Sequence, residues 1–351
     1  MDQAKTSQFA DKIFSDMAGA MGMGMAYLGV KTGLFKVMAE RGPVTTGELA
    51  AALGMIPRYV EEWLLGMTAA GYLECDSQAG TFSLPEEHAF LLASEGTDHY
   101  AGGLPYGAIS FLWAAPRVAR AFRDGGGVDF KEFPEDCHAA LDLMNRGNYD
   151  NRLVPAWMRE MPTVTDALNG GGSALDVGCG AGRVSLNLAR AFPCARFMGV
   201  DTDPRSIKLA RAEADKAGLA ERVEFVAGTI DSLPPRLKFD LITLCDCLHD
   251  LGTPEETLGM IRERLTPDGT LFIMEPKAAD RPEDNRNSVA TMFYGFSLFH
   301  CMTQSLAKGG PGLGTCMGPA RTEALIREAG FTRFKRLPIK SRVNLFYEVR
   351  A

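Results

Sequence analysis

The sequence predicts an α/β protein with a Rossmann-like sheet of seven strands, preceded by an α-rich winged-helix domain. From about residue 166 onward, short apolar runs alternate with amphipathic helical stretches, which is typical of a parallel sheet covered on both faces. Two further strand candidates, residues 331–337 and 343–350, end the chain. We therefore expect five parallel strands extended by a C-terminal antiparallel hairpin.

The first 95 residues show helical patterns that end in a hairpin pattern. Apolar residues recur at helical spacing over 27–40, and Thr45 is suited to cap a second helix that has Glu48 in its first turn. Pro57 is suited to start a third helix, and residues 72–84 then alternate around a turn that contains glycine. Three helices followed by a hairpin predict a winged helix. The expected domains are residues 1–95, a helical linker and substrate-side loop at 96–165, and a ligand-binding domain at 166–351.

The parallel part of the sheet is expected from five apolar runs with helical stretches between them. Near-continuous apolar character indicates strands that are buried on both faces. The expected strands are 174–178, 196–201, 222–228, 239–245 and 270–275. The clearest helical stretches between them are 183–192, 204–218 and 254–265.

Composition and charge exclude several classes of protein. The formal net charge of −7 argues against a surface that binds nucleic acid. No apolar run is long enough to span a membrane, and the N-terminus lacks the apolar core of a signal peptide, so a cytoplasmic protein is expected. The eight cysteines are scattered without the spacing of a metal site, which favours free thiols and no bound metal.

A glycine-rich loop follows the first predicted strand. Gly178, Gly180 and Gly182 would let the backbone turn tightly and approach a ligand at the carboxyl end of the sheet. The spacing is G-x-G-x-G, whereas a dinucleotide site has G-x-G-x-x-G. Asp176 adds a carboxylate that disfavours a diphosphate and suits a cationic ligand. An ordinary tight turn is the alternative interpretation.

The ends of the next two strands offer further ligand contacts. Asp201 ends the second strand, where an acid can accept both hydroxyl groups of a ribose, whereas Asp203 is suited to cap the helix that begins at Pro204. The loop 227–234 after the third strand lies where it could border an adenine ring. Cys245, at the end of the fourth strand, is expected to lie against the cofactor rather than act as a nucleophile.

Five motifs stand in the order found in class I S-adenosylmethionine-dependent methyltransferases, which this chain resembles over about residues 170–275. They are LDVGCGAG at 175–182, GVD at 199–201, FVAGTIDSLP at 225–234, FDLITLCDCLHDL at 239–251 and LTPDGTLFIME at 265–275. The resemblance implies S-adenosyl-L-methionine as cofactor, with its methionine part along Asp176, Gly178, Gly180 and Gly182 and its ribose on Asp201. Thr229, Ile230 and Asp231 would flank the adenine. Many relatives have Asp at the position of Thr229, so the adenine contact is expected from the Thr229 hydroxyl or from Asp231.

The same resemblance implies catalytic roles for two residues near the carboxyl end of the sheet. In related O-methyltransferases with a winged helix, a His-Asp pair follows the fourth strand, and the histidine acts as a general base. This position corresponds to His249, and Glu275 at the end of the fifth strand would orient it. A histidine that only packs against its neighbours is the alternative.

The N-terminal segment resembles the winged-helix dimerisation domain of small-molecule methyltransferases. A homodimer formed through this domain is therefore expected, with a small-molecule methyl acceptor as the other partner. Within 45–75 the sole basic residue is Arg58, and four glutamates accompany it, which disfavours DNA binding.

The expected function is in-line transfer of a methyl group to a small molecule by an enzyme of class EC 2.1.1. Oxygen, nitrogen and thiol acceptors would need a base such as His249. The alternative is methylation of a thioether carboxylic acid, of the 4-methylthio-2-hydroxybutyrate type used in dimethylsulfoniopropionate synthesis. This reaction would need no base. A regulator that senses S-adenosylmethionine is a further alternative.

Overall fold

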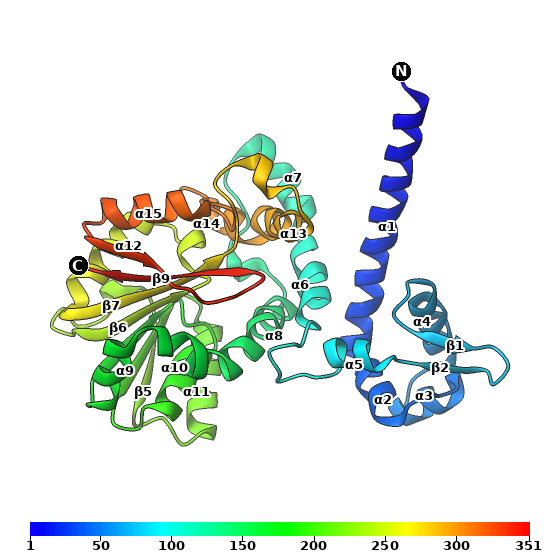
Figure 1. The fold of residues 1–351 in the computed structure, drawn as a ribbon, viewed down its shortest axis with the longest axis horizontal. Helices are drawn as coiled ribbons and strands as arrows, with labels where there is room; N and C mark the ends of the chain where they lie inside the picture. The colour runs from blue at the N-terminus through cyan, green and yellow to red at the C-terminus, as the bar shows by residue number, and fades with distance from the viewer. The chain divides into compact units, whose positions relative to one another are not determined.

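The computed structural model describes residues 1–351, which form two compact units (Figure 1). One unit combines residues 1–112 with 134–147, and the other combines 113–133 with 148–351. The segment 96–165, expected to be a linker, is thus divided between the two units. None of the helices combines the length and the apolar character that a membrane span requires.

The first unit contains the predicted winged helix. The side chain of Thr45 accepts a hydrogen bond from the amide of Glu48, whose carboxylate returns one to the Thr45 amide, so the expected cap is confirmed. Residues 27–40 are not one helix, because Gly33 adopts a left-handed conformation (φ 79°) that separates two helices. The helices are α1 (Gln3–Lys31), α2 (Leu34–Arg41), α3 (Thr46–Leu53), α4 (Pro57–Ala69), α5 (Glu86–Leu92), α6 (Gly103–Leu112) and most of α8 (Glu135–Asn151). The hairpin strands are β1 (Glu74–Asp76) and β2 (Thr81–Ser83).

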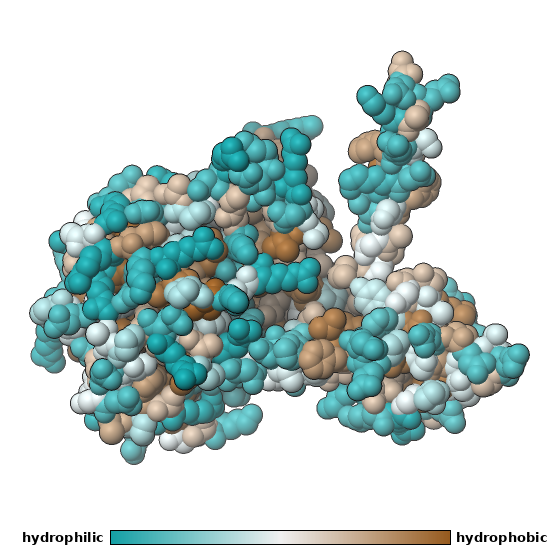
Figure 2. Space-filling model, in the orientation of Figure 1, coloured by the Kyte–Doolittle hydropathy of each residue, from teal (hydrophilic) through white to brown (hydrophobic).

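The N-terminal half of α1 is exposed, whereas its C-terminal end is anchored in the first unit. The indole of Trp63 donates to the carbonyl of Met25 at 2.8 Å, and the hydroxyl of Tyr27 donates to Asp136 at 2.7 Å. All residues from 1 to 21 are exposed, and apolar side chains are conspicuous among them in the space-filling view (Figure 2).

The second unit is built on the predicted seven-stranded sheet, in the order β5-β4-β3-β6-β7-β9-β8. The first five strands of that order are parallel, β9 runs antiparallel to β7, and β8 runs antiparallel to β9. Both the parallel strands and the terminal hairpin are thus confirmed. The strands are β3 (Ser173–Val177), β4 (Arg196–Asp201), β5 (Val223–Ala227), β6 (Phe239–Cys245), β7 (Leu265–Pro276), β8 (Arg333–Arg336) and β9 (Asn344–Arg350).

Alternate residues of the sheet enter two separate hydrophobic cores. On one face, Ala174, Phe197 and Phe272 pack with apolar side chains of α9, α10 and α11. On the other face, Leu175, Ile242 and Leu271 pack with α12 and α15. Figure 1 shows these two helical layers on opposite sides of the sheet. The helices of this unit are α7 (Ala115–Asp124), α9 (Pro162–Asn169), α10 (Arg183–Ala191), α11 (Pro204–Lys216), α12 (Pro254–Arg264), α13 (Ser288–Phe296), α14 (Met302–Ala307) and α15 (Gly318–Glu328).

The sheet order reverses next to β3, because β4 lies on one side of it and β6 on the other. In open α/β sheets, ligands bind at the carboxyl ends of the strands at such a switch point. The glycine loop follows β3 directly, and the carboxyl ends of β4, β5, β6 and β7 face the same edge.

Candidate functional site

In the glycine loop after β3, every second residue is a glycine with a left-handed backbone conformation. The φ angles are 72° at Gly178, 51° at Gly180 and 79° at Gly182. A Cβ atom at Gly178 would lie 2.3 Å from the sulfur of Cys247, and one at Gly182 would lie 2.4 Å from the ring of Phe225. At Gly180, by contrast, no heavy atom lies within 4 Å of the Cβ position. Gly178 and Gly182 are thus required by packing, whereas Gly180 leaves open space for a ligand.

Asp201 and Asp203 have different hydrogen-bond partners, and the predicted cap by Asp203 is present. Asp203 caps α11, and its Oδ2 accepts the amide of Ser206 at 3.0 Å. The carboxylate of Asp201 faces the glycine loop, since its Oδ2 accepts the amide of Gly180 at 2.9 Å. Its Oδ1 accepts the amide of Asp203 at 2.8 Å. Burial raises the pKa of Asp201, and these two amides partly offset that effect.

Asp176 is a buried carboxylate below the same loop. It is 4% exposed, and its Oδ1 accepts the hydroxyl of Thr243 on the neighbouring strand β6 at 2.6 Å. Burial raises the pKa of Asp176 to about 7, and the charge of Asp201 adds to that rise. Neither carboxylate forms an ion pair with a lysine or arginine. A cationic ligand over Gly180 would stabilise the ionised forms of both residues, and this acidic environment fits a cofactor that carries a sulfonium and an ammonium group near Asp176.

The loop after β5 presents two polar side chains at the edge of the sheet. Thr229 and Asp231 are exposed, and the Thr229 hydroxyl donates to the carboxylate of Asp231. Ile230 between them is 1% exposed and belongs to the hydrophobic core on the α12 side. The side chains free to contact a ligand at this position are therefore those of Thr229 and Asp231.

His249 and Glu275 form a buried pair at the carboxyl ends of β6 and β7. His249 lies in the short 3₁₀ turn η5 (Leu248–Asp250), and its Nδ1 is 2.7 Å from Oε2 of Glu275. The other carboxylate oxygen accepts the amide of Leu248 at 3.0 Å. Both side chains are 3% exposed. Burial lowers the pKa of His249, but the charge of Glu275 and the adjacent thiol of Cys301 outweigh it, so the pKa stands well above its usual range.

Cys245 ends β6 beside this group, and its thiol is not activated. Burial raises the pKa of Cys245 well above its ordinary value, and the nearby charges of Asp176 and Asp246 add to the effect. The thiol is therefore neutral near pH 7, as a residue that only lies against a ligand would be.

Two residues close to this group escaped the sequence analysis. Tyr149, at the end of α8, has a pKa well above its usual value because of burial and of the groups Cys245, Asp246 and Asp176. Asp176 and Asp246 are thus close enough to Tyr149 to disfavour ionisation of its hydroxyl. Thr243 is the partner of Asp176. No local pattern marks either residue, since both contacts depend on how the chain folds.

Known protein families match two segments of the chain. Residues 168–309 match the family described as "Methyltransferase domain", and residues 19–94 match the "Rv2258c-like winged HTH domain". The tRNA1(Val) (adenine(37)-N6)-methyltransferase from two strains of Porphyromonas gingivalis is 32% identical over 164 and 184 residues. Those alignments span 40% and 46% of this chain and 62% and 69% of the relatives.

Two solved structures are similar over nearly the whole chain. A Nostoc punctiforme protein described as an O-methyltransferase has a TM-score of 0.73 and 17% identity, covering 98% of this chain and 99% of its own. Human N-acetylserotonin methyltransferase in complex with S-adenosylmethionine has a TM-score of 0.70 and 20% identity, covering 97% of each chain. At this identity the likeness shows a shared fold.

The fold, the glycine loop and these matches define a class of protein. The chain belongs to the class I S-adenosylmethionine-dependent methyltransferases and carries an N-terminal winged-helix domain. S-adenosyl-L-methionine is the cofactor of this class, as the human structure illustrates.

Proposed function

We propose that this chain transfers a methyl group from S-adenosylmethionine to an oxygen, nitrogen or thiol nucleophile of a small molecule, with His249 as the general base. The observation that carries the proposal is the buried contact of 2.7 Å between Nδ1 of His249 and Glu275. A histidine oriented by a carboxylate, at the carboxyl edge of the sheet that bears the glycine loop, is in the right place to receive a proton.

The tautomer of His249 follows from its partner. An ionised Glu275 accepts a hydrogen bond, so Nδ1 carries a proton and Nε2 is left as the proton acceptor. Glu275 also stabilises the imidazolium that forms when the proton arrives. Because Glu275 is itself held by the Leu248 amide, the ring has a fixed direction before any acceptor binds.

The cofactor would be held by the residues around the glycine loop. The proposed contacts are Asp176 and the backbone at Gly178, Gly180 and Gly182 for the methionine part, Asp201 for the ribose, and Thr229, Ile230 and Asp231 for the adenine, with Cys245 alongside. When bound, S-adenosylmethionine supplies an electrophilic methyl group on a positively charged sulfur. The contribution of the protein is mainly positioning, since the nucleophile must approach in line with the methyl–sulfur bond.

A small-molecule acceptor is favoured over a nucleic acid, although two of the relatives are named as methyltransferases of a tRNA adenine. The net charge is −7, and the one basic residue of α4, Arg58, is paired with Glu61 and Glu62. A helix that contacts phosphates would instead present unpaired basic residues. The same arrangement disfavours a DNA-binding regulator.

We also propose a homodimer formed through the N-terminal unit. The exposed part of α1 bears Phe9, Ile13, Met17 and Met21 at intervals of one helical turn. Such a stripe on a helix in water is expected to be covered by a partner, and a second copy presents the same stripe.

The experiment that tests the function is an acceptor screen with isotopically labelled cofactor. Purified protein should first bind S-adenosylhomocysteine in a calorimetric titration, and label should then pass to one chemical class of acceptor. Binding without transfer to any hydroxyl, amine, thiol or thioether would favour a sensor, and absence of binding would contradict the proposal.

A further inference from the structure

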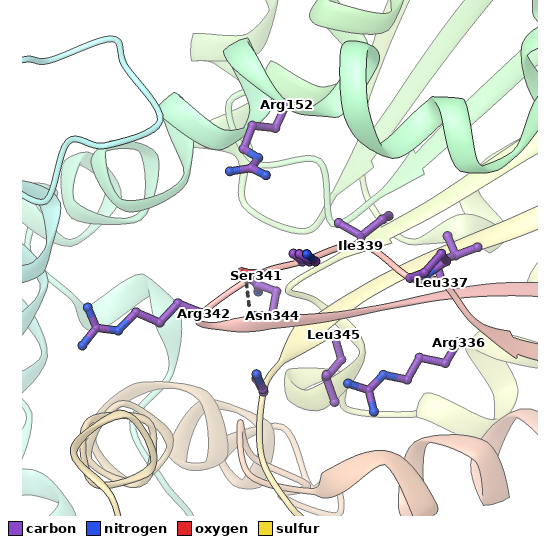
Figure 3. Close-up of a pocket in the computed structure, with 11 residues that line it drawn as sticks. Arg152, Arg336, Leu337, Ile339, Ser341, Arg342, Asn344 and Leu345 are labelled. Atoms are coloured by element: carbon purple, nitrogen blue, oxygen red, sulfur yellow. Dashed lines mark hydrogen bonds between the residues drawn. The ribbon is translucent and has the colours of Figure 1, made fainter.

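A cavity of about 550 Å³ lies beside the loop 337–343 that connects β8 to β9 (Figure 3). Cationic side chains from three separate segments line it, namely Arg152, Lys277, Arg336, Lys340 and Arg342. None of its other lining residues is acidic. Figure 3 shows the guanidinium of Arg152 directed toward the hairpin loop. We call this cavity the basic pocket.

Positive charge gathers in the basic pocket although the chain as a whole is acidic. The chain as a whole has a formal net charge of −7, yet four of the five cations in the basic pocket, Lys277, Arg336, Lys340 and Arg342, form no ion pair with an acid. Unpaired like charges around one cavity repel each other, and the repulsion is relieved when an anion enters. An arginine fork and a lysine ammonium are the groups that hold a carboxylate or a phosphate in proteins.

The basic pocket is joined to the residues around the proposed base. Lys277 follows Glu275 by two positions, and its amide donates to the carbonyl of Val343 at 2.7 Å. Leu345 of the pocket pairs with Glu275 across β7 and β9. Asn344, which also lines the pocket, donates to Oδ1 of Asp246 at 3.0 Å, and Asp246 is the residue after β6. The pocket and the His249 pair thus share the same edge of the sheet.

We propose that the basic pocket binds the charged end of an anionic methyl acceptor, a carboxylate or a phosphate. The inference rests on the proposed function, because it names the chemical class of the acceptor that His249 would deprotonate. The anionic group sits among the cations of the hairpin loop, while the nucleophile of the same molecule is presented to His249.

The direct test is a calorimetric titration of the full chain with inorganic phosphate and, separately, with citrate at constant ionic strength. The double variant Arg336→Gln, Lys340→Gln removes two lining charges. Arg333→Gln is the matched control, since Arg333 is an exposed cation of the same strand β8 outside the pocket. We expect saturable binding to the wild-type chain, roughly tenfold or more weaker binding to the double variant, and little change in the control. Absence of saturable binding to the wild-type chain, or equal binding to all three proteins, overturns the proposal.

The two anions also distinguish the possible sources of charge. Tighter binding of phosphate indicates an acceptor with a phosphate group, and tighter binding of citrate indicates a carboxylic acid. S-adenosylhomocysteine is titrated into the same samples, so that a chain that fails as a methyltransferase is recognised separately from one whose pocket does not bind anions.

Steady-state kinetics test whether the acceptor occupies the basic pocket. With an acidic acceptor from the labelled-cofactor screen, the double variant should raise KM by roughly tenfold and leave kcat nearly unchanged, because the lost contact acts on binding. The carboxamide of that acceptor should be a poor substrate for the wild-type enzyme and should not respond to the substitutions. A neutral acceptor that is turned over well and is not inhibited by phosphate or citrate contradicts the assignment.

Discussion

Glu275 contacts both the ring of His249 and the backbone beside it. One carboxylate oxygen lies 2.7 Å from Nδ1 of His249, and the other accepts the amide of Leu248 at 3.0 Å. Because both groups are almost fully buried, water does not screen their interaction. The contact therefore fixes the direction of the imidazole and raises its pKa, and both effects can be measured.

Replacement of His249 should show whether the acceptor loses a proton during methyl transfer. If a proton is removed during transfer, His249→Ala should lower kcat by roughly two to four orders of magnitude and should remove the acidic limb of the pH–rate profile. In the wild-type enzyme that limb should have its midpoint above the usual histidine value, since Glu275 raises the pKa of His249. Steady-state rates from about pH 5 to pH 9 give both results.

A thioether acceptor would produce a different outcome. No proton leaves in that reaction, so His249→Ala would keep the shape of the pH profile and lose only the activity that depends on packing. Such a result would contradict His249 as a base and would support the formation of a sulfonium product.

Removing the charge of Glu275 should shift the acidic limb of the pH–rate profile to lower pH. Glu275→Gln removes the charge that raises the pKa of His249, so the midpoint of the acidic limb should fall, and kcat should drop by roughly tenfold or more because the ring loses its fixed direction. Glu256→Gln, an exposed acid in the first turn of α12, is the control. A midpoint that does not move in Glu275→Gln would show that the limb belongs to another group.

The proposed contact between Asp201 and the ribose can be tested by comparing substitutions of Asp201 and Asp203. Asp201→Ala should weaken binding of S-adenosylhomocysteine by roughly 10- to 100-fold, since a charge-assisted hydrogen bond to the ribose is lost. Asp203→Ala should leave that affinity nearly unchanged and lower the stability of the protein by about 0.5–2 kcal/mol, as the loss of a helix cap does. Calorimetry and denaturant unfolding of both variants measure these effects. The reverse pattern would assign the ribose to Asp203.

The elements predicted correctly are those that a short stretch of sequence is enough to specify. The strand candidates 174–178 and 239–245 correspond to β3 and β6 because a run of buried apolar residues needs no distant partner to be recognised. Thr45 and Glu48 form their cap within one turn for the same reason. Gly33 escaped notice because the apolar spacing continues across it, although its backbone conformation separates α1 from α2.

The contacts that were missed join segments far apart in the chain. Thr243 meets Asp176 only because β6 is placed next to β3, and the basic pocket combines Arg152 with Lys277 and the hairpin loop. No local pattern in the sequence places these residues together. Their relation depends on the strand order, which a single sequence does not specify.

The buried acid below the glycine loop should make the stability of the cofactor-free protein depend on pH. The pKa of Asp176 is raised to about 7 by burial, so its stabilising contribution is complete below its unfolded value of about 4 and is lost as the pH rises through about 7. Asp176→Asn keeps an acceptor for Thr243 and cannot ionise. The variant should therefore have a higher Tm than the wild type at about pH 8 and a much smaller advantage at about pH 5, because the contribution of Asp176 is lost progressively between about pH 4 and about pH 7.

The same substitution should weaken the binding of S-adenosylmethionine, because a cationic ligand loses a nearby negative charge. Asp215→Asn, in an exposed position of α11, is the control for both measurements. Equal Tm differences at the two pH values would show that Asp176 does not change its protonation state between them, which contradicts the raised pKa.

The exposed stripe of α1 gives the last prediction, which concerns assembly. Phe9, Ile13, Met17 and Met21 are 63%, 54%, 58% and 59% exposed, although their spacing places them on one face of the helix. Covering this face in a dimer removes apolar surface from water, and two charges placed on it would have to be buried as well. The double variant Ile13→Glu, Met17→Glu should therefore shift the dimer to monomer at concentrations where the wild type is dimeric, and Ser15→Glu, on the opposite side of the helix, should not. Size-exclusion chromatography with light scattering distinguishes the two states, and a wild-type chain that remains monomeric at every concentration would contradict the proposed dimer.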